Sequence, residues 1–249
     1  MIMSDKTSPV PVRAICFDLF NTLVSVGRVP ECVGAFTADI LGLDHDIWRQ
    51  ACFGEHHDIC GPTDPLDNMR RMAHAIDADI PEAVLSQAVA HRQQRFNHAL
   101  RHVEEGLIDA LAALREAGIR LALVSNASTA EVQAWPESPL APLFDCALFS
   151  CECGYKKPDA EIYQLALQQL AVESSECLFV GDGGSDEHCG AHTAGMRPVL
   201  ITRYIDRDRE QRLLEKLDSV LHARVESVSE LLTLVEPGSK DGSRDASPG

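Results

Sequence analysis

Long hydrophobic runs, excess positive charge and regularly spaced cysteines are all missing from this 249-residue sequence. No stretch approaches 18 uninterrupted apolar residues, so the sequence predicts no membrane-spanning helix. The N-terminal stretch, MIMSDKTSPVPVR, is polar and contains no long apolar segment of the signal-peptide kind. We therefore expect a cytoplasmic protein without a membrane partner.

Basic residues are outnumbered: 22 lysines and arginines stand against 38 aspartates and glutamates, which gives a net charge of −16. An acidic surface repels nucleic acid and anionic lipid, so neither is expected as a partner. A small anionic metabolite could still bind where local positive charge or a metal ion supplies the attraction. The oligomeric state stays open at this level.

The cysteines follow no metal-binding or disulfide pattern. There are nine, an odd number at irregular spacing, which is typical of reduced thiols. The one close pair, Cys151 and Cys153, has a single residue between its members, whereas zinc knuckles and thioredoxin-type motifs have two. We expect most of these cysteines to be small buried apolar residues rather than metal ligands.

The sequence does contain an alternation of strand-like and helix-like segments. Short apolar runs predict strands at residues 13–17, 119–124, 145–150, 177–181 and 197–201. Helical patterns lie between them at 106–118 and 161–172. Such alternation predicts an α/β fold with a mainly parallel, Rossmann-like sheet that is covered on both faces.

A helical region interrupts this alternation after the first strand. It holds seven of the ten histidines, few strand-like runs and a helical pattern at 83–103, and it would suit a lid over a site at the strand ends. The predicted organisation is an α/β core at 11–25 and 103–236, a helical cap at 26–102, and disordered tails at 1–10 and 237–249.

Polar residues stand where three of the predicted strands end: Asp18, Ser125 with Asn126, and Asp182. Binding sites in parallel sheets form at the carboxyl ends of the strands, so these side chains converge if the strands are neighbours. Asp18 and Asp182 are suited to hold Mg²⁺, which prefers carboxylates, carbonyl oxygens, water and phosphate.

Three further polar residues suit phosphoryl transfer, in which catalysis is mostly positioning and charge neutralisation. Thr22 offers a hydroxyl group, and Lys157 offers a fixed positive charge. Asp186 follows Asp182 by four residues, so it would lie one helical turn further on and orient the site.

Four ordered motifs resemble those of the haloacid dehalogenase (HAD) superfamily of aspartate-nucleophile hydrolases. They are FDLFNTLV at 17–24, LALVSNAS at 121–128, GYKKPDAEIY at 154–163 and FVGDGGSDEHCGAHTAGM at 179–196. The gap between the first two motifs is similar to that of members with a helical, C1-type cap. Any single motif is weak evidence, whereas the ordered set is strong.

The resemblance implies a role for each matching residue. Asp18 would be the nucleophile and would form a phospho-aspartyl intermediate. Ser125 and the backbone of Asn126 would hold the transferring group. Lys157 would neutralise charge on Asp18 and on the phosphoryl oxygens.

Phe20 departs from the family phosphatases, which carry an acid at this place. The resemblance makes Asp18, Asp182 and the backbone carbonyl of Phe20 the Mg²⁺ ligands, and a carbonyl does not depend on the side chain. The missing acid would protonate the leaving group and then activate water, a contribution of about 10²- to 10⁴-fold. A slow phosphatase, a preference for good leaving groups, and a proton from the substrate or from a cap histidine all stay open.

The 2-haloacid dehalogenases provide an alternative, because they also carry an aromatic residue at this place and displace halide without a metal. The stretch WRQ at 48–50, in which Arg49 would contact substrate, and Tyr163 resemble their sequence. However, they have small polar residues where this chain has Gly-Asp, and a carboxylate at Asp182 would repel a metal-free Asp18 and a carboxylate substrate.

We therefore favour a Mg²⁺-dependent phosphatase that acts on a small phosphorylated metabolite. A metal-independent dehalogenase is the first alternative. A weakly active ligand-binding protein that keeps the fold is the second.

Overall fold

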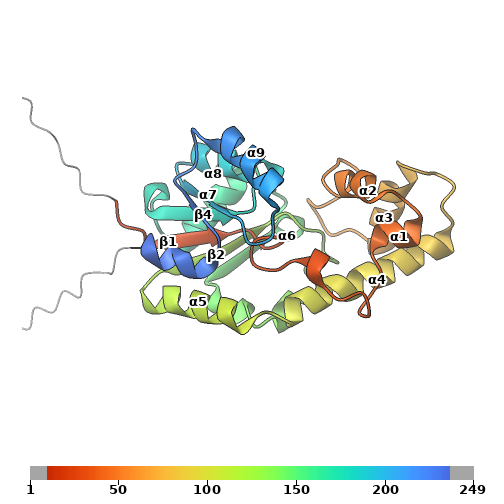
Figure 1. Cartoon of the computed structure of the whole chain (residues 1–249), viewed down its shortest axis with the longest axis horizontal. Coiled ribbons are helices and arrows are strands. Elements are labelled where there is room, and N and C mark those ends of the chain that lie inside the picture. The colour runs from red at the N-terminus through yellow and green to blue at the C-terminus, as the bar shows by residue number, and fades with distance from the viewer. Residues whose placement is uncertain (1–9, 236–249) are drawn as a thin grey trace, which may run out of the picture.

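The computed structural model describes residues 10–235 and contains a six-stranded sheet with helices on both faces (Figure 1). The strands are β1 (Ala14–Phe17), β2 (Arg120–Ser125), β3 (Cys146–Phe149), β4 (Cys177–Gly181), β5 (Arg197–Ile201) and β6 (Ala223–Val225). Their spatial order is β3-β2-β1-β4-β5-β6, and each neighbouring pair is parallel. The predicted α/β class with a Rossmann-like sheet is confirmed.

Helices of the sheet region flank both faces of this sheet. They are α5 (Glu105–Glu116), α6 (Ser150–Cys153), α7 (Ala160–Leu170), α8 (Glu187–Thr193), α9 (Arg207–Leu217) and the 3-10 helix η6 (Val228–Thr233). Strand β1 shows why both faces are covered, because all its residues are buried and alternate between two apolar clusters. Ile15 and Phe17 pack with residues of α5 and η6, whereas Ala14 and Cys16 pack with residues of α7. Such two-sided burial is typical of a parallel sheet.

The chain between β1 and β2 is helical and has its own apolar cluster. It comprises η1 (Val26–Arg28), α1 (Thr37–Leu41), α2 (His45–Ala51), α3 (Pro65–His74) and α4 (Glu82–Arg101). Asp44 and Asp64 begin α2 and α3 by accepting hydrogen bonds from the first backbone amides of each helix. Helices α1 to α3 lie together beyond one end of the sheet, and α4 runs from them towards α5 (Figure 1). We call residues 26–102 the insertion.

Most predicted elements occur within two residues of their expected positions. Ser150 begins α6 instead of ending β3, and the helical pattern at 83–103 forms one helix, α4. Neither β6 nor α9 was predicted, because β6 has only three residues and α9 is mostly charged. The predicted disordered tails lie outside the described residues, apart from Val10. Across residues 10–235, no helix is both long and apolar enough to cross a membrane.

Candidate active site

Three adjacent strands bring the predicted polar residues to one edge of the sheet. Strand β1 lies between β2 and β4. Ser125 is the last residue of β2, while Asp18 and Asp182 directly follow β1 and β4. Parallel strands end at the same edge, so residues far apart in the sequence meet there.

Asp18 is buried and its two carboxylate oxygens have different partners. The hydroxyl of Thr22 donates to Oδ2 at 2.8 Å, and the ammonium group of Lys157 donates to Oδ1 at 2.6 Å. The backbone amide of Asp18 donates to the carbonyl of Val180 at 2.9 Å, which ties the residue to β4. These contacts fix the direction of the carboxylate at the end of β1.

Lys157 connects Asp18 to a second acid, Glu187, that the sequence did not single out. Its Nζ lies 2.6 Å from an oxygen of each carboxylate, and all three side chains are buried. Burial opposes the charged form of the lysine, but Asp18 and Glu187 outweigh burial and raise the pKa of Lys157. The ammonium group is therefore a permanent positive charge beside Asp18.

Asp186, predicted to orient the site, lines the cavity beside these residues but has Lys216 as its side-chain partner. Its side chain is exposed and forms an ion pair with Lys216 at 2.5 Å. The backbone at Asp186 has a φ of 49°, so the chain is not yet helical there and α8 begins one residue later. This offset turns Glu187, rather than Asp186, towards Lys157.

Ser125 and Asn126, at the end of β2, have separate environments. The Asn126 side chain accepts from the backbone amide of Lys157 at 2.7 Å and donates to its carbonyl at 2.9 Å, which holds the lysine segment in place. The hydroxyl of Ser125 is buried and has no hydrogen-bond partner among the described residues. This hydroxyl lacks the partner that buried polar groups normally have.

Asp182 is buried beside a cation from a helix that the sequence did not predict. Its Oδ1 accepts from the backbone amide of Gly184 at 3.0 Å, and its Oδ2 lies 2.9 Å from Nη2 of Arg209, in α9. Burial and the neighbouring charge of Asp18 raise the pKa of Asp182, while Arg209 opposes this shift.

The carboxylates of Asp18, Asp182 and Glu187 fit a hard divalent cation. One oxygen from each lies within 4.8 Å of the other two, and all three residues are buried. Oxygens on opposite sides of an octahedral Mg²⁺ ion lie about 4 Å apart, so the spacing suits this ion. Burial, reinforced by Asp18 and Asp182, raises the pKa of Glu187 to about 8 despite the opposing charge of Lys157. Burial is the largest cause of both raised pKa values and neighbouring acids add to it, so a bound cation would favour the charged forms of Asp182 and Glu187.

A cavity of about 710 Å³ lies in front of these residues and is lined by both the sheet region and the insertion. The sheet region contributes Asp18, Phe20 and Asp182, and the insertion contributes Phe53 and Phe96. Arg49 is not among the lining residues. Its exposed side chain contacts Asp46, so the structure gives no support to the predicted substrate contact.

Comparison with known proteins identifies the family. A model of the haloacid dehalogenase-like hydrolases matches residues 12–191, and a model described as HAD-hydrolase-like matches residues 154–229. The first match covers most of the chain, which therefore belongs to the haloacid dehalogenase-like hydrolases. The predicted family is confirmed.

Two curated relatives are similar over most of their length. The chain is 28% identical over 240 residues to glyceraldehyde 3-phosphate phosphatase of Methanopyrus kandleri, covering 92% of this chain and 100% of that protein. It is 31% identical over 227 residues to phosphoglycolate phosphatase of Pseudomonas putida, covering 84% of this chain and 78% of that protein. These relatives support the predicted hydrolase of the phosphatase kind.

Solved structures of both reaction types share the fold. An L-2-haloacid dehalogenase from Xanthobacter autotrophicus has a TM-score of 0.62 at 19% identity, covering 90% of this chain and 98% of that chain. A HAD phosphatase from Thermococcus onnurineus has a TM-score of 0.58 at 23% identity, covering 90% of this chain and 97% of that chain. At these identities the likeness establishes the fold alone.

Proposed function

We propose that this chain is a Mg²⁺-dependent phosphatase with Asp18 as its nucleophile. The observation that carries the proposal is the buried Asp18 carboxylate, which is held by Thr22 and Lys157 and flanked by Asp182 and Glu187. A carboxylate that is held by a hydroxyl and an ammonium group is oriented for nucleophilic attack on a bound substrate. The two relatives named as phosphatases support this reaction class.

The residues around Asp18 supply the positions that phosphoryl transfer needs. One oxygen of Asp18 would attack phosphorus and form an aspartyl phosphate. The hydroxyl of Ser125 and the backbone of Asn126 would bind phosphoryl oxygens. Lys157 would neutralise charge that passes from Asp18 to the phosphoryl group.

The three buried acids support a metal site. Asp18, Asp182 and the backbone carbonyl of Phe20 would hold Mg²⁺, and Glu187 lies near enough to orient its shell. When bound, the ion supplies positive charge to the phosphoryl oxygens. Arg209 donates to Oδ2 of Asp182, which leaves Oδ1 as the oxygen that would face the ion.

We propose that the insertion serves as a cap that selects the substrate. Phe53 and Phe96 line the cavity across from the sheet, so the insertion faces whatever group is attached to the phosphate. The relatives' names refer to small phosphorylated metabolites, and we propose a substrate of this size and charge.

Nine free cysteines are typical of a reducing compartment, which supports a cytoplasmic location.

One observation favours a second candidate, a metal-independent 2-haloacid dehalogenase. Phe20 supplies an aromatic side chain, not an acid, next to the proposed nucleophile. The charge around Asp18 argues against this reaction, because Asp182 and Glu187 would repel a carboxylate substrate unless a cation were bound. The phosphatase is therefore the better fit.

A substrate panel combined with chelation tests the proposal. We expect wild-type protein to hydrolyse phosphate monoesters, to lose that activity in EDTA and to regain it with excess Mg²⁺. Asp18→Asn should abolish turnover, because an amide oxygen is too weak a nucleophile for phosphorus. Arg49→Gln is the matched control, since Arg49 lies outside the cavity, and should retain activity.

Two outcomes would contradict the proposal. Release of halide from 2-chloropropionate in the presence of EDTA would replace it with the dehalogenase. Absence of turnover on both substrate types, with Mg²⁺ binding retained, would instead indicate a ligand-binding protein on the same fold.

A further inference from the structure

We propose that His57 performs the proton transfers that Phe20 cannot, which rests on the proposed phosphatase function. His57 lies in the loop between α2 and α3 and lines the same cavity as Asp18. The insertion holds seven histidines, and within residues 10–235 His57 alone among them lines this cavity. The structure thus reduces the seven histidine candidates for the proton donor to one.

The direction of phosphoryl transfer places the leaving group on the side of the insertion. The attacking and leaving oxygens lie roughly in line through phosphorus, so the leaving oxygen points away from Asp18. The cavity wall opposite the sheet is formed by the loop after α2, including Cys52 and His57, and by α4, including Arg92 and Phe96. This wall adjoins Phe20, whose ring packs edge-on against Phe96 with 5.0 Å between ring centroids.

The other ionisable groups near His57, which are Arg92, Cys52 and Glu131, are unsuited to proton exchange near neutral pH. The Arg92 guanidinium stays protonated, because Glu131 and Cys52 outweigh burial and raise its pKa. Burial raises the pKa of the Cys52 thiol. Burial would also raise the pKa of Glu131, but His57 and Arg92 reverse that effect and hold it below its usual range. The imidazole of His57 is the remaining side chain here of a type that both donates and accepts protons in catalysis.

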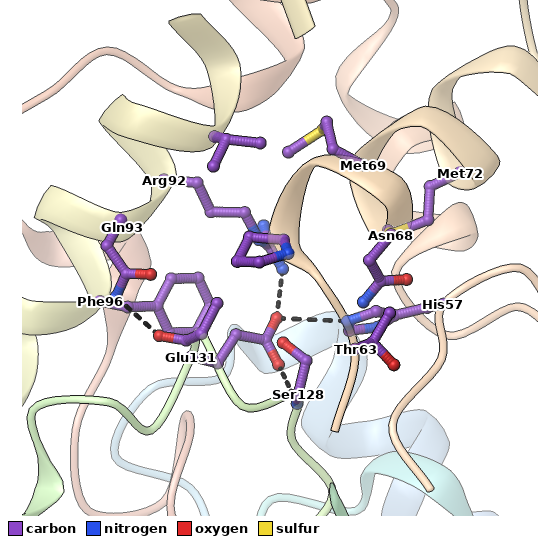
Figure 2. Close-up of a pocket in the computed structure, with 13 residues that line it drawn as sticks. His57, Thr63, Asn68, Met69, Met72, Arg92, Gln93, Phe96, Ser128 and Glu131 are labelled. Atoms are coloured by element: carbon purple, nitrogen blue, oxygen red, sulfur yellow. Dashed lines mark hydrogen bonds and ion pairs between the residues drawn. The ribbon is translucent and has the colours of Figure 1, made fainter. Parts of the chain in front are cut away.

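Hydrogen bonds orient the imidazole of His57. A backbone carbonyl only accepts, so Nδ1 donates to the carbonyl of Cys52 at 2.8 Å. Nε2 lies 3.5 Å from Oε1 of Glu131, a contact longer than a normal hydrogen bond, so we take Nε2 as the atom that exchanges its proton with the substrate. Figure 2 shows Glu131 between His57, Arg92 and the backbone of Ser128.

Glu131 acts as a positioning residue in this arrangement. It lies on the loop after β2, its side chain is buried, and the Ser128 amide fixes Oε2 at 2.8 Å. A buried carboxylate next to imidazole stabilises the protonated form and holds the ring in one orientation. A residue of the sheet region therefore holds two residues of the insertion, His57 and Arg92, at the cavity.

The proposed reaction is balanced in two steps. In the first, Asp18 forms a bond to phosphorus, the bond from phosphorus to the leaving oxygen breaks, and that oxygen takes the Nε2 proton of His57. In the second, neutral Nε2 accepts a proton from a water molecule whose oxygen attacks phosphorus. The bond from phosphorus to Asp18 then breaks, which releases phosphate and restores the carboxylate and the imidazolium.

Rapid-mixing kinetics of full-length His57→Asn with two substrates test the inference. The leaving group of p-nitrophenyl phosphate needs little protonation. We therefore expect the variant to release one equivalent of p-nitrophenol in a burst, and the rate of this burst should lie within about tenfold of the wild-type rate. Loss of the base should then slow steady-state turnover by about 10²- to 10⁴-fold. With an alkyl ester, either phosphoglycolate or glyceraldehyde 3-phosphate, the first turnover should already be slowed to this extent.

Matched variants separate chemistry from structure. His56→Asn changes the neighbouring exposed histidine, whose Nε2 lies 3.9 Å from Oε1 of Glu55, and should behave as wild type with both substrates. Glu131→Gln should slow the first turnover of the alkyl ester more than the p-nitrophenol burst. The burst itself shows that a variant is folded and that Asp18 is competent.

Three results would overturn the inference. Equal slowing of the burst and of the alkyl ester would assign His57 a structural role. Unchanged steady-state rates in His57→Asn would exclude proton transfer by His57. The proposed function would stand if turnover still requires Asp18. A wild-type protein that hydrolyses no phosphate monoester of the panel would remove the proposed function and this inference together.

Discussion

Ser125 and Ser150 are two buried serines at neighbouring strand ends with opposite hydrogen-bond status. The hydroxyl of Ser150 accepts from the amide of Ala127 at 3.0 Å and donates to its carbonyl at 3.3 Å. The hydroxyl of Ser125 has no partner within residues 10–235. A buried polar group without a partner costs stability, and an oxygen of a bound substrate would supply the missing partner of Ser125.

This contrast predicts that activity and stability respond differently at the two serines. Ser125→Ala should leave the free energy of unfolding unchanged or slightly higher, and should lower kcat by about 10²- to 10³-fold through loss of a phosphoryl contact. Ser150→Ala should lower the free energy of unfolding by about 1–2 kcal/mol. Urea denaturation and steady-state kinetics on both variants provide the measurement. A stability loss in Ser125→Ala with normal kcat would contradict the assigned role.

Also at the residue scale, the site residues that the sequence did not predict were missed for one physical reason. Asp18 and Asp182 were predictable because short motifs carry them at strand ends, and Lys157 because a short motif carries it in the loop before α7. Glu187 and Arg209 were not, since their contacts depend on where α8 begins and on how α9 packs. Arg49 stays a prediction from the sequence: its exposed side chain pairs with Asp46, and it is not among the residues that line the cavity.

At the scale of elements, the packing of α7 against α8 holds the lysine segment beside Asp18. Tyr163 of α7 is buried and donates to the backbone carbonyl of Glu187 at 2.8 Å, so it supports the start of α8 without lining the cavity. Gly190 lies at the contact. A Cβ atom there would approach the carbonyl of Pro158 and the hydroxyl of Tyr163 to 2.7 Å each.

Gly190→Ala should therefore disturb both the fold and the site. We expect a loss of about 1–3 kcal/mol in the free energy of unfolding, because the added methyl group meets backbone in a packed contact. Activity should fall as well, since Pro158 follows Lys157 in the chain. Gly106→Ala in α5 is the matched control, as a Cβ there has nothing within 4 Å. It should stabilise the helix by up to about 1 kcal/mol, and equal stability of the two variants would refute the packing argument.

At the scale of the whole molecule, His188 connects α8 to β5 and makes folding sensitive to acid. Its Nε2 donates to the carbonyl of Val199 at 3.1 Å, and burial lowers the pKa of His188 to about 4. Above the ordinary histidine pKa of about 6.5 the ring is neutral in both the folded and the unfolded chain. Between that value and about pH 4 only the unfolded chain binds the proton, so stability falls with falling pH.

The expected contribution is a loss of about 3 kcal/mol in the free energy of unfolding between pH 6.5 and pH 4. Urea denaturation across this range should show a shallower pH dependence in His188→Gln than in wild type. His192→Gln, which changes an exposed histidine of the same helix, should keep the wild-type slope. Parallel slopes for wild type and His188→Gln would exclude this residue as the source.

The sequence by itself determined the fold class, the strand ends and the motif residues around Asp18. Apolar strands and polar strand ends are local patterns, and the requirement to bury both faces of a parallel sheet turns them into one topology. Only the tertiary structure decided which second acid bonds to Lys157, which cationic side chain pairs with Asp182, and which of the seven insertion histidines lines the cavity. Those contacts join residues separated by tens of positions in the chain. Their distances follow from helix starts and packing angles, which local residue patterns do not specify.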